Sequence, residues 1–430
     1  MKSICPILVL LFLSHACSHE RAIRSVSYTP AESGKCNADT SNHYHYALPV
    51  QHEGNLPLLI ILDSGGDGLL AVNKVSPAVL RIPCIMIGSD RVRNNFPGYE
   101  RAVELLINDA CQKFPVNKEQ VYLAGFSGGA RMAYEYARNH PVKGILMCGA
   151  GPAVNSFQEL PCRVYMIAGT TDFNFSEMYY NPLTISGQQR FLADYFRGSH
   201  EWPPAERMKD GFLFLMGKSI PYGESLLKQE SSILTEEADS LLARDETLFA
   251  LKAVEKALSF DPDNKAAKRH IERIKKDRKL VRNIFKIESD LALENKIDQA
   301  YSQASMERDS IWWAKEIKQL SLEIANNSGE TKDHYLRIKA FLGILFYSRL
   351  NSLIRSQPDN NQIVHILAAY RMAEPENPDV YYDYALYEWE MAKRESALKY
   401  LKTTLSLGFK DQQKLATDFP VDLLNQVRAP

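Results

Sequence analysis

The stretch Val121-Tyr122-Leu123-Ala124-Gly125-Phe126-Ser127-Gly128-Gly129 decides the fold of this chain. Its apolar part, which extends from Gln120 to Phe126, predicts a short buried strand. The Gly-x-Ser-x-Gly pattern then places a serine on a tight turn, and residues Ala130–Ala137 continue with helical spacing. A strand, a sharp turn and a helix in this order expose the serine hydroxyl at the helix N-terminus. Ser127 is therefore the candidate nucleophile.

A serine hydroxyl is a weak nucleophile until a base accepts its proton, and an acid must orient that base. In this topology the acid and then the histidine follow the serine along the chain. Asp172 comes directly after the apolar run Arg163–Gly169, where the end of a sheet strand would hold an orienting acid. His200 lies in a loop fixed by a preceding glycine and two following prolines. Asp194 is the competing acid, but it lies inside an apparent strand or helix, Phe191–Phe196.

Backbone N–H groups are expected to stabilise the negative charge that develops on the carbonyl oxygen during acyl transfer. One donor is Gly128, which follows the serine, and the other belongs to a glycine-rich loop after an earlier strand. Leu58–Leu62 is that strand, and Asp63-Ser64-Gly65-Gly66-Asp67-Gly68 is that loop. We assign the second donor to Asp67, with Gly66 as the near alternative. The loop lacks the Lys-Ser/Thr of a phosphate-binding loop, so that interpretation is discounted.

Three histidines precede the serine, at His43, His45 and His52. No acidic or cysteine companion lies at a spacing typical of metal ligands. Alternating surface positions on a strand explain these histidines better than a metal site does. The proposed chemistry needs neither a metal nor an organic cofactor.

Together these motifs resemble the α/β-hydrolase family, and most of all its compact esterases of the dienelactone-hydrolase, polyester-depolymerase and feruloyl-esterase kind. The resemblance extends from about Tyr44 to about Lys218. It implies the roles of nucleophile, orienting acid and base for Ser127, Asp172 and His200. Related oxyanion loops usually carry His-Gly where this chain has Gly65-Gly66, a change that keeps the backbone donors but predicts a more mobile loop.

The chain has 430 residues, which is long enough for two domains. Between residues 41 and 218, apolar strand-like runs alternate with helical patterns, which predicts a mostly parallel sheet with helices on both faces. From residue 219 to residue 430 the strand patterns stop and helix-forming residues dominate, which predicts an all-α domain. The net charge of −1 gives no support for nucleic-acid binding.

Parts of the helical half resemble tetratricopeptide repeats, which are helix pairs of about 34 residues. One pair has the expected spacing at Leu234, Ala238, Leu241, Ala250, Val254, Ala257 and Pro262. A second unit ends with Tyr370, Ala373 and Pro378. A further helix pair follows between Tyr381 and Leu407. Stacked helix pairs leave a concave side that suits a peptide or protein partner. The charged run Lys268–Arg282 is interpreted as a solvated helix face, and Trp312 and Trp313 as core residues.

The N-terminus has the features of an export signal. The apolar run Ile7–Leu13 follows a basic residue and is too short to span a bilayer. We therefore expect a signal segment over residues 1–17 and a tether over residues 18–40. Ordinary cleavage after Ala16 and lipidation of Cys17, as in bacterial lipoproteins, are both compatible with the pattern, and we favour lipidation. The chain is then expected in the bacterial envelope, anchored to a membrane through Cys17, with its domains in the periplasm or at the cell surface.

The sequence thus predicts an exported serine hydrolase that cleaves a small or polymeric carboxylic ester through an acyl-enzyme. The preference for an ester follows from the resemblance, because fold alone does not determine function. Two alternatives stay open, namely a peptidase or amidase with the same residues, and a catalytically vestigial envelope protein whose helical half binds a protein partner. The presence of all three triad residue types favours an active enzyme.

Overall fold

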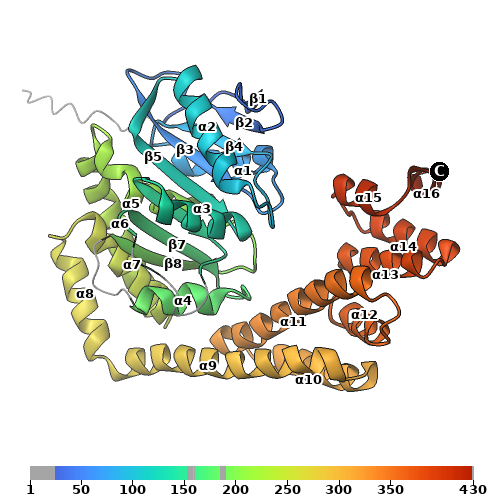
Figure 1. Cartoon of the computed structure of the whole chain (residues 1–430). Coiled ribbons are helices and arrows are strands. Elements are labelled where there is room, and N and C mark those ends of the chain that lie inside the picture. The colour runs from blue at the N-terminus through green and yellow to red at the C-terminus, as the bar shows by residue number, and fades with distance from the viewer. Residues whose placement is uncertain (1–24, 153–157, 159, 185–189, 429–430) are drawn as a thin grey trace, which may run out of the picture.

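An eight-stranded sheet forms the centre of the N-terminal half (Figure 1). The computed structural model describes residues 25–152, 158, 160–184 and 190–428. The strands of the sheet are β1 (Glu32–Lys35), β2 (His43–Ala47), β3 (Leu56–Leu62), β4 (Ile85–Ser89), β5 (Val116–Phe126), β6 (Gly144–Cys148), β7 (Arg163–Gly169) and β8 (Phe191–Phe196). They lie in the order β1-β2-β4-β3-β5-β6-β7-β8. The pairs from β4 to β8 are parallel, whereas β1 and β2 join the edge in antiparallel pairings.

Helices cover both faces of this sheet. The helices of this half are α1 (Gly68–Val75), α2 (Tyr99–Lys113), α3 (Gly128–Asn139), α4 (Phe175–Thr184) and α5 (Ala205–Met216). α1 and α5 contact each other on one face, while α2 and α3 pack against the central strands from the other. A strand covered on both faces needs apolar residues throughout, and β3 is buried at every position. The predicted α/β-hydrolase fold is therefore the observed one.

The described residues 25–40 contribute to the sheet. Tyr28 forms a bridge with Pro49 and donates a hydrogen bond from its hydroxyl to the carbonyl of Ile82 (2.7 Å), and β1 pairs with β2. The prediction of a tether over residues 18–40 is therefore wrong for the described part of that range. The polar sequence of β1 gave no apolar signal because an edge strand is held by backbone hydrogen bonds. Residues 18–24, the signal segment and Cys17 lie outside the described residues.

The rest of the chain is helical, as predicted. Its helices are α6 (Gly223–Ala243), α7 (Thr247–Phe260), α8 (Lys265–Lys276), α9 (Arg278–Glu307), α10 (Ser310–Asn326), α11 (Gly329–Ser356), α12 (Gln362–Ala373), α13 (Pro378–Glu390), α14 (Arg394–Ser406), α15 (Gln412–Asp418) and α16 (Val421–Arg428). The expected helix pairs occur as α6–α7 and α13–α14. Their assignment to the tetratricopeptide family stays a prediction. Trp313 is fully buried, in agreement with a core position.

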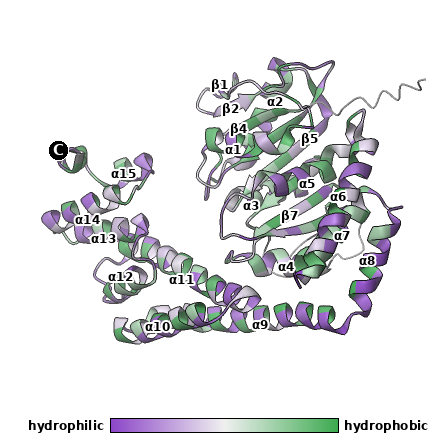
Figure 2. Cartoon of the chain, turned by 180° about the vertical axis from the view of Figure 1, so that it is seen from behind, coloured by the Kyte–Doolittle hydropathy of each residue, from purple (hydrophilic) through white to green (hydrophobic). Residues whose placement is uncertain are grey.

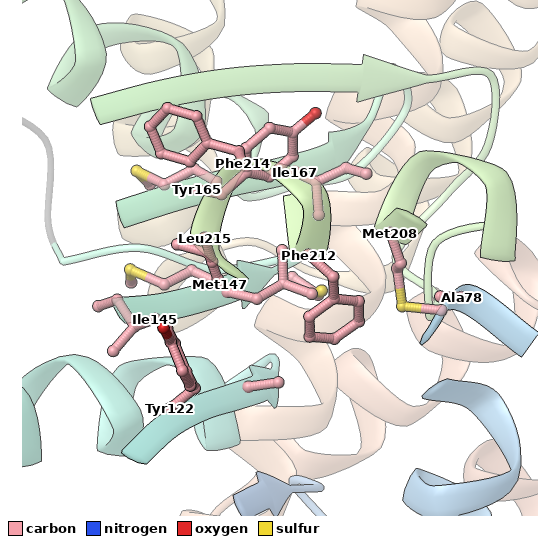
Figure 3. Packing of buried hydrophobic residues seen from close by; sticks show 14 of the residues in the cluster. Ala78, Tyr122, Ile145, Met147, Tyr165, Ile167, Met208, Phe212, Phe214 and Leu215 are labelled. Carbon is pink, nitrogen blue, oxygen red and sulfur yellow. The ribbon is translucent and has the colours of Figure 1, made fainter. Parts of the chain in front are cut away.

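The boundary between the two hydrophobic cores does not coincide with the change in amino-acid composition. One hydrophobic core extends along the sequence from Cys36 to Leu291, and a second one from Ala304 to Leu424. Figure 3 shows part of the first core, where Phe212, Phe214 and Leu215 of α5 lie near side chains of the central strands. Helices α6 and α7 thus belong to the core of the α/β half. Composition changes at about residue 219, whereas the two cores separate only within α9.

The helical half extends to the side of the sheet toward which the parallel strands point. Figures 1 and 2, seen from opposite sides, both place α11–α16 beyond that edge, with α8 and α9 leading to them. Near this edge, Arg337 of α11 donates to the carbonyl of Thr170 (2.7 Å), and Arg93 donates to the side chain of Gln413 (2.8 Å). The described helices include no apolar stretch of the length that a bilayer crossing needs.

Candidate active site

Ser127 lies on the turn that joins β5 to α3. Its φ angle is +52°, a conformation that costs energy for any residue with a side chain. The turn is close-packed, because a Cβ added to Gly129 would clash with the carbonyl of Leu62. The backbone N–H of Ser127 donates to the carbonyl of Cys148 (2.8 Å). A strained serine held at a helix N-terminus is the arrangement that the sequence pattern predicts.

The structure brings Ser127, His200 and Asp172 into one chain of contacts. His200 Nε2 lies 2.9 Å from Ser127 Oγ, and His200 Nδ1 lies 3.0 Å from each carboxylate oxygen of Asp172. Asp172 is fully buried and also accepts a hydrogen bond from the backbone N–H of Asn174 (2.8 Å). A carboxylate at Nδ1 favours the tautomer that carries its proton there, which leaves Nε2 to accept the serine proton.

Asp194, the competing acid, lies elsewhere. It is buried on β8, where it accepts hydrogen bonds from the hydroxyl of Tyr165 (3.1 Å) and from Lys256 Nζ (2.8 Å). Burial alone would raise the pKa of this carboxyl, but the neighbouring Lys256 lowers it below its usual value. Asp194 therefore forms a buried ion pair with Lys256, and Asp172 is the carboxylate that contacts His200.

Adjacent loops at the ends of β7 and β8 hold the acid and the histidine together. Thr171 donates from its backbone N–H (3.0 Å) and its hydroxyl (2.8 Å) to the carbonyl of Gly198. The loops are so close that a Cβ on Gly169 would clash with that same carbonyl. The His200 ring lies between Phe126 and Phe173, with ring centroids 4.9 and 4.3 Å away. These contacts restrict both the position and the orientation of the imidazole.

The predicted oxyanion donors lie at the N-termini of two helices. Gly128 begins α3, and Asp67 is the N-cap of α1, where its carboxylate accepts from Leu70 N–H. In the part of the chain that the structure describes, the backbone N–H groups of these two residues donate to no protein acceptor. The N–H of Gly66 donates to the carbonyl of Asp63 (3.1 Å). A developing oxyanion needs N–H donors without a protein acceptor, so Gly128 and Asp67 fit the predicted role better than Gly66.

The sequence analysis missed a link between the oxyanion loop and the histidine loop. Trp202 Nε1 donates to Asp63 Oδ1 (3.0 Å), and Asp63 Oδ2 accepts from Gly65 N–H (2.8 Å). Trp202 also stacks on Phe126, with ring centroids 5.3 Å apart. Asp63 begins the glycine-rich loop and Trp202 lies in the loop of His200, but 139 positions separate them and no local pattern reveals the contact.

Asn94 is another residue that no sequence pattern indicated. Its side-chain amide lies directly against the Gly128 Cα, so that any Cβ at Gly128 would clash with it. Its backbone N–H donates to the carbonyl of Ser64 in the oxyanion loop (2.8 Å). Asn94 is exposed and lies beside the residue that follows Ser127.

The early histidines form no metal centre in the described part of the chain. His43 and His45 lie on β2, and His45 contacts Asp90 at 3.1 Å. No group of three or more histidine, cysteine, aspartate or glutamate side chains among the described residues is placed to hold a metal ion.

Comparison with known proteins gives similarity at the level of structures only. No family model matches the chain, and a search of curated proteins finds no match. A thermostable esterase from Pseudomonas putida ECU1011 is 12% identical, with a TM-score of 0.33, over 42% of this chain and 76% of its own. Est1E from Butyrivibrio proteoclasticus is 13% identical, with a TM-score of 0.34, over 44% of this chain and 99% of its own. The sheet order and the serine turn of this chain itself define its fold.

Proposed function

We propose that this protein is a serine hydrolase that cleaves carboxylic esters through an acyl-enzyme. The observation that carries the proposal is the unbroken contact chain from Ser127 Oγ through both nitrogens of His200 to the buried carboxylate of Asp172. A serine, a histidine and a buried acid in this geometry are the parts that activate a hydroxyl for attack on a carbonyl.

The reaction follows from the position of each group. His200 Nε2 accepts the proton of Ser127 as Oγ attacks the ester carbonyl, and Asp172 stabilises the imidazolium that forms. The N–H groups of Gly128 and Asp67 stabilise the oxyanion. His200 then protonates the leaving alcohol, and a water molecule, deprotonated by the same histidine, releases the acid and restores Ser127.

A pair of matched substrates tests the proposal. We expect turnover of a p-nitrophenyl ester but little cleavage of the corresponding p-nitroanilide. Ser127→Ala should lower kcat by up to about 10⁶-fold while leaving the fold intact, because no later step can proceed without the nucleophile. Ser199→Ala is the control, since this exposed serine adjoins His200 without a role in the contact chain.

Each other result selects a different function. Comparable cleavage of the anilide would indicate an amidase or peptidase. A folded protein that turns over neither substrate would favour the vestigial alternative, with the helical half as the working part. Activity retained in Ser127→Ala would remove Ser127 from the mechanism.

We further propose that the protein is exported and anchored to the bacterial envelope through a lipidated Cys17, and that the helical half binds a protein partner. The N-terminal sequence supports the first part, and the stacked helix pairs support the second. Mass spectrometry of the N-terminal peptide from the membrane fraction tests the anchor, because an acylated Cys17 and an unmodified N-terminus at Cys17 differ in mass.

A further inference from the structure

The surface of α8 and the first half of α9 is strongly basic. Residues 265–286 contain ten lysines and arginines and two acidic residues, a net charge of +8, although the whole chain carries −1. Figure 2 shows hydrophilic residues along α8 and the adjacent part of α9. The sequence of the run Lys268–Arg282 predicts a solvated helix face, and the structure adds a more specific arrangement of its charges.

Four arginines on this surface have no acidic partner. Arg269, Arg273, Arg278 and Arg282 are all exposed, and none of them forms an ion pair with a carboxylate among the described residues. Several of the lysines, by contrast, are paired, as Lys279 is with Asp245 (2.9 Å). Unpaired positive charges that gather on one surface repel each other and attract an anionic partner.

Apolar side chains lie among these charges on the outward face of α9. The inward face of α9 carries the buried residues Leu280, Ile287 and Leu291. The opposite face, at helical spacing, carries Arg278, Arg282, Phe285, Ser289, Leu293 and Lys296. Phe285 is 68% exposed and Leu293 is 49% exposed, and Val281 beside them is 47% exposed. A helix with basic and exposed apolar side chains on its free face is typical of helices that lie in a membrane interface.

We propose that the α8–α9 surface, defined by residues 265–296, docks on a bilayer that contains anionic phospholipids. The arginines and lysines would contact lipid headgroups, and Phe285, Val281 and Leu293 would enter the boundary between headgroups and acyl chains. A nucleic acid fits less well, because the aliphatic side chains of Val281 and Leu293 cannot stack on bases. The sequence expectation of a lipid on Cys17 agrees, since stable anchoring by acylation commonly requires a second, basic contact.

Vesicle cosedimentation of the full chain tests this proposal. We expect binding to vesicles of phosphatidylcholine mixed with phosphatidylglycerol, weak binding to phosphatidylcholine alone, and loss of the difference when salt rises from about 0.1 M to about 1 M. Arg278→Glu with Arg282→Glu should lower the partition coefficient by about 30-fold or more, and Phe285→Ser by about tenfold. The N-terminal apolar segment is common to all these chains, so the differences report on the α8–α9 surface alone.

Lys402→Glu with Lys410→Glu is the matched control, because both lysines are exposed on the helical half and the change in net charge is the same. This control should bind like the original chain, and all variants should turn over a soluble ester equally, which separates this proposal from the proposed hydrolase activity. Equal vesicle binding by the arginine variant and the control would overturn the proposal. So would binding to heparin or single-stranded DNA without preferential binding to anionic vesicles, a result that would assign the surface to a soluble polyanion.

Discussion

His200 is the residue whose position matters most for the proposed chemistry. It is held from three directions, by Asp172 at Nδ1, by the rings of Phe126 and Phe173 on its sides, and by a loop that packs against the end of β7. An imidazole fixed in this way loses little entropy when it accepts the serine proton. Preorganisation of this kind is a main source of catalytic rate.

The assignment of the orienting acid leads to a prediction for Asp172→Asn. An asparagine keeps the shape of the side chain but favours the wrong tautomer of His200, so kcat should fall by about 10⁴-fold. Steady-state kinetics on the p-nitrophenyl ester, together with a thermal melt that shows an intact fold, would measure this.

Asp194→Asn is the matched control for that variant, since Asp194 is equally buried and contacts Lys256 rather than His200. It should reduce stability with little effect on kcat. If Asp194→Asn produced the large loss of kcat and Asp172→Asn did not, the acid would be wrongly assigned.

At the scale of elements, the helix pair α6–α7 is fastened to the sheet by a buried charge. Lys256 of α7 is completely buried and donates to Asp194 of β8 (2.8 Å) and Asp210 of α5 (2.7 Å). Burial raises the pKa of Asp210 above its usual value, in spite of the nearby lysine. Lys256 is the nearest cation to both carboxylates, since Arg207 lies 3.9 Å from Asp194 and Lys209 lies 3.8 Å from Asp210.

Lys256→Met should lower the free energy of unfolding by about 3–5 kcal/mol, because two buried carboxylates would lose their common partner. Lys228→Met on α6 is the control, because this exposed lysine, paired with Glu224, should contribute little to the free energy of unfolding. Urea denaturation followed by circular dichroism measures both values. Equal effects of the two substitutions would contradict the view that α6–α7 shares the core of the α/β half.

Asp383 on α13 should make the stability of the helical half depend on pH. Its side chain is buried, both of its carboxylate oxygens lack a hydrogen-bond partner among the described residues, and burial raises its pKa to about 8. The folded state therefore keeps a proton that the unfolded chain releases near its ordinary, lower pKa. The stability contributed by this proton is complete at acid pH and is lost as the pH rises through about 8.

Asp383→Asn should remove that dependence. The variant should resemble the original chain near the ordinary pKa of an aspartate, about 4, and should be the more stable of the two at pH 8 and above. Thermal melts across this pH range provide the measurement. A parallel decline of both proteins between these pH values would show that Asp383 is not the titrating group.

At the scale of the whole molecule, the helical half lies beyond the edge of the sheet that carries Ser127 and contacts the loop before Asp172 (Figure 1). Arg337 is buried, binds Glu294 of α9 through a fork of hydrogen bonds and donates to the carbonyl of Thr170, two residues before Asp172. The loop that carries Asp172 is therefore contacted by the helical half. This arrangement gives the helices a direct influence on the site.

Arg337→Lys should keep the charge opposite Glu294 but lose the contact with Thr170. We expect stability to fall by about 1–3 kcal/mol and kcat by about tenfold, because the loop that carries Asp172 loses a support. Arg355→Lys, which affects an exposed ion pair with Asp418 inside the helical half, is the control and should leave kcat unchanged. A kcat unaffected by Arg337→Lys would mean that the acid loop is held without the helical half.

The sequence predicted the features that local patterns carry. Apolar runs signal the strands of the sheet. The serine turn, Asp172 and His200 each follow such a run closely in the sequence. The edge strand β1, the Asp63–Trp202 hydrogen bond and the packing of α6–α7 on the sheet carry no such signal. They depend on contacts between residues far apart in the chain, and in one case on backbone pairing that is indifferent to side chains.

The most direct test of the central claim, that Ser127 is an activated nucleophile, is labelling of the purified protein with a fluorophosphonate probe. The adduct would be located by mass spectrometry, before and after heat denaturation. We predict one modified residue, Ser127, in the native protein and none after denaturation, because only the folded site brings His200 to the hydroxyl. A folded protein that stays unlabelled, or labelling at another serine, would contradict the proposed mechanism.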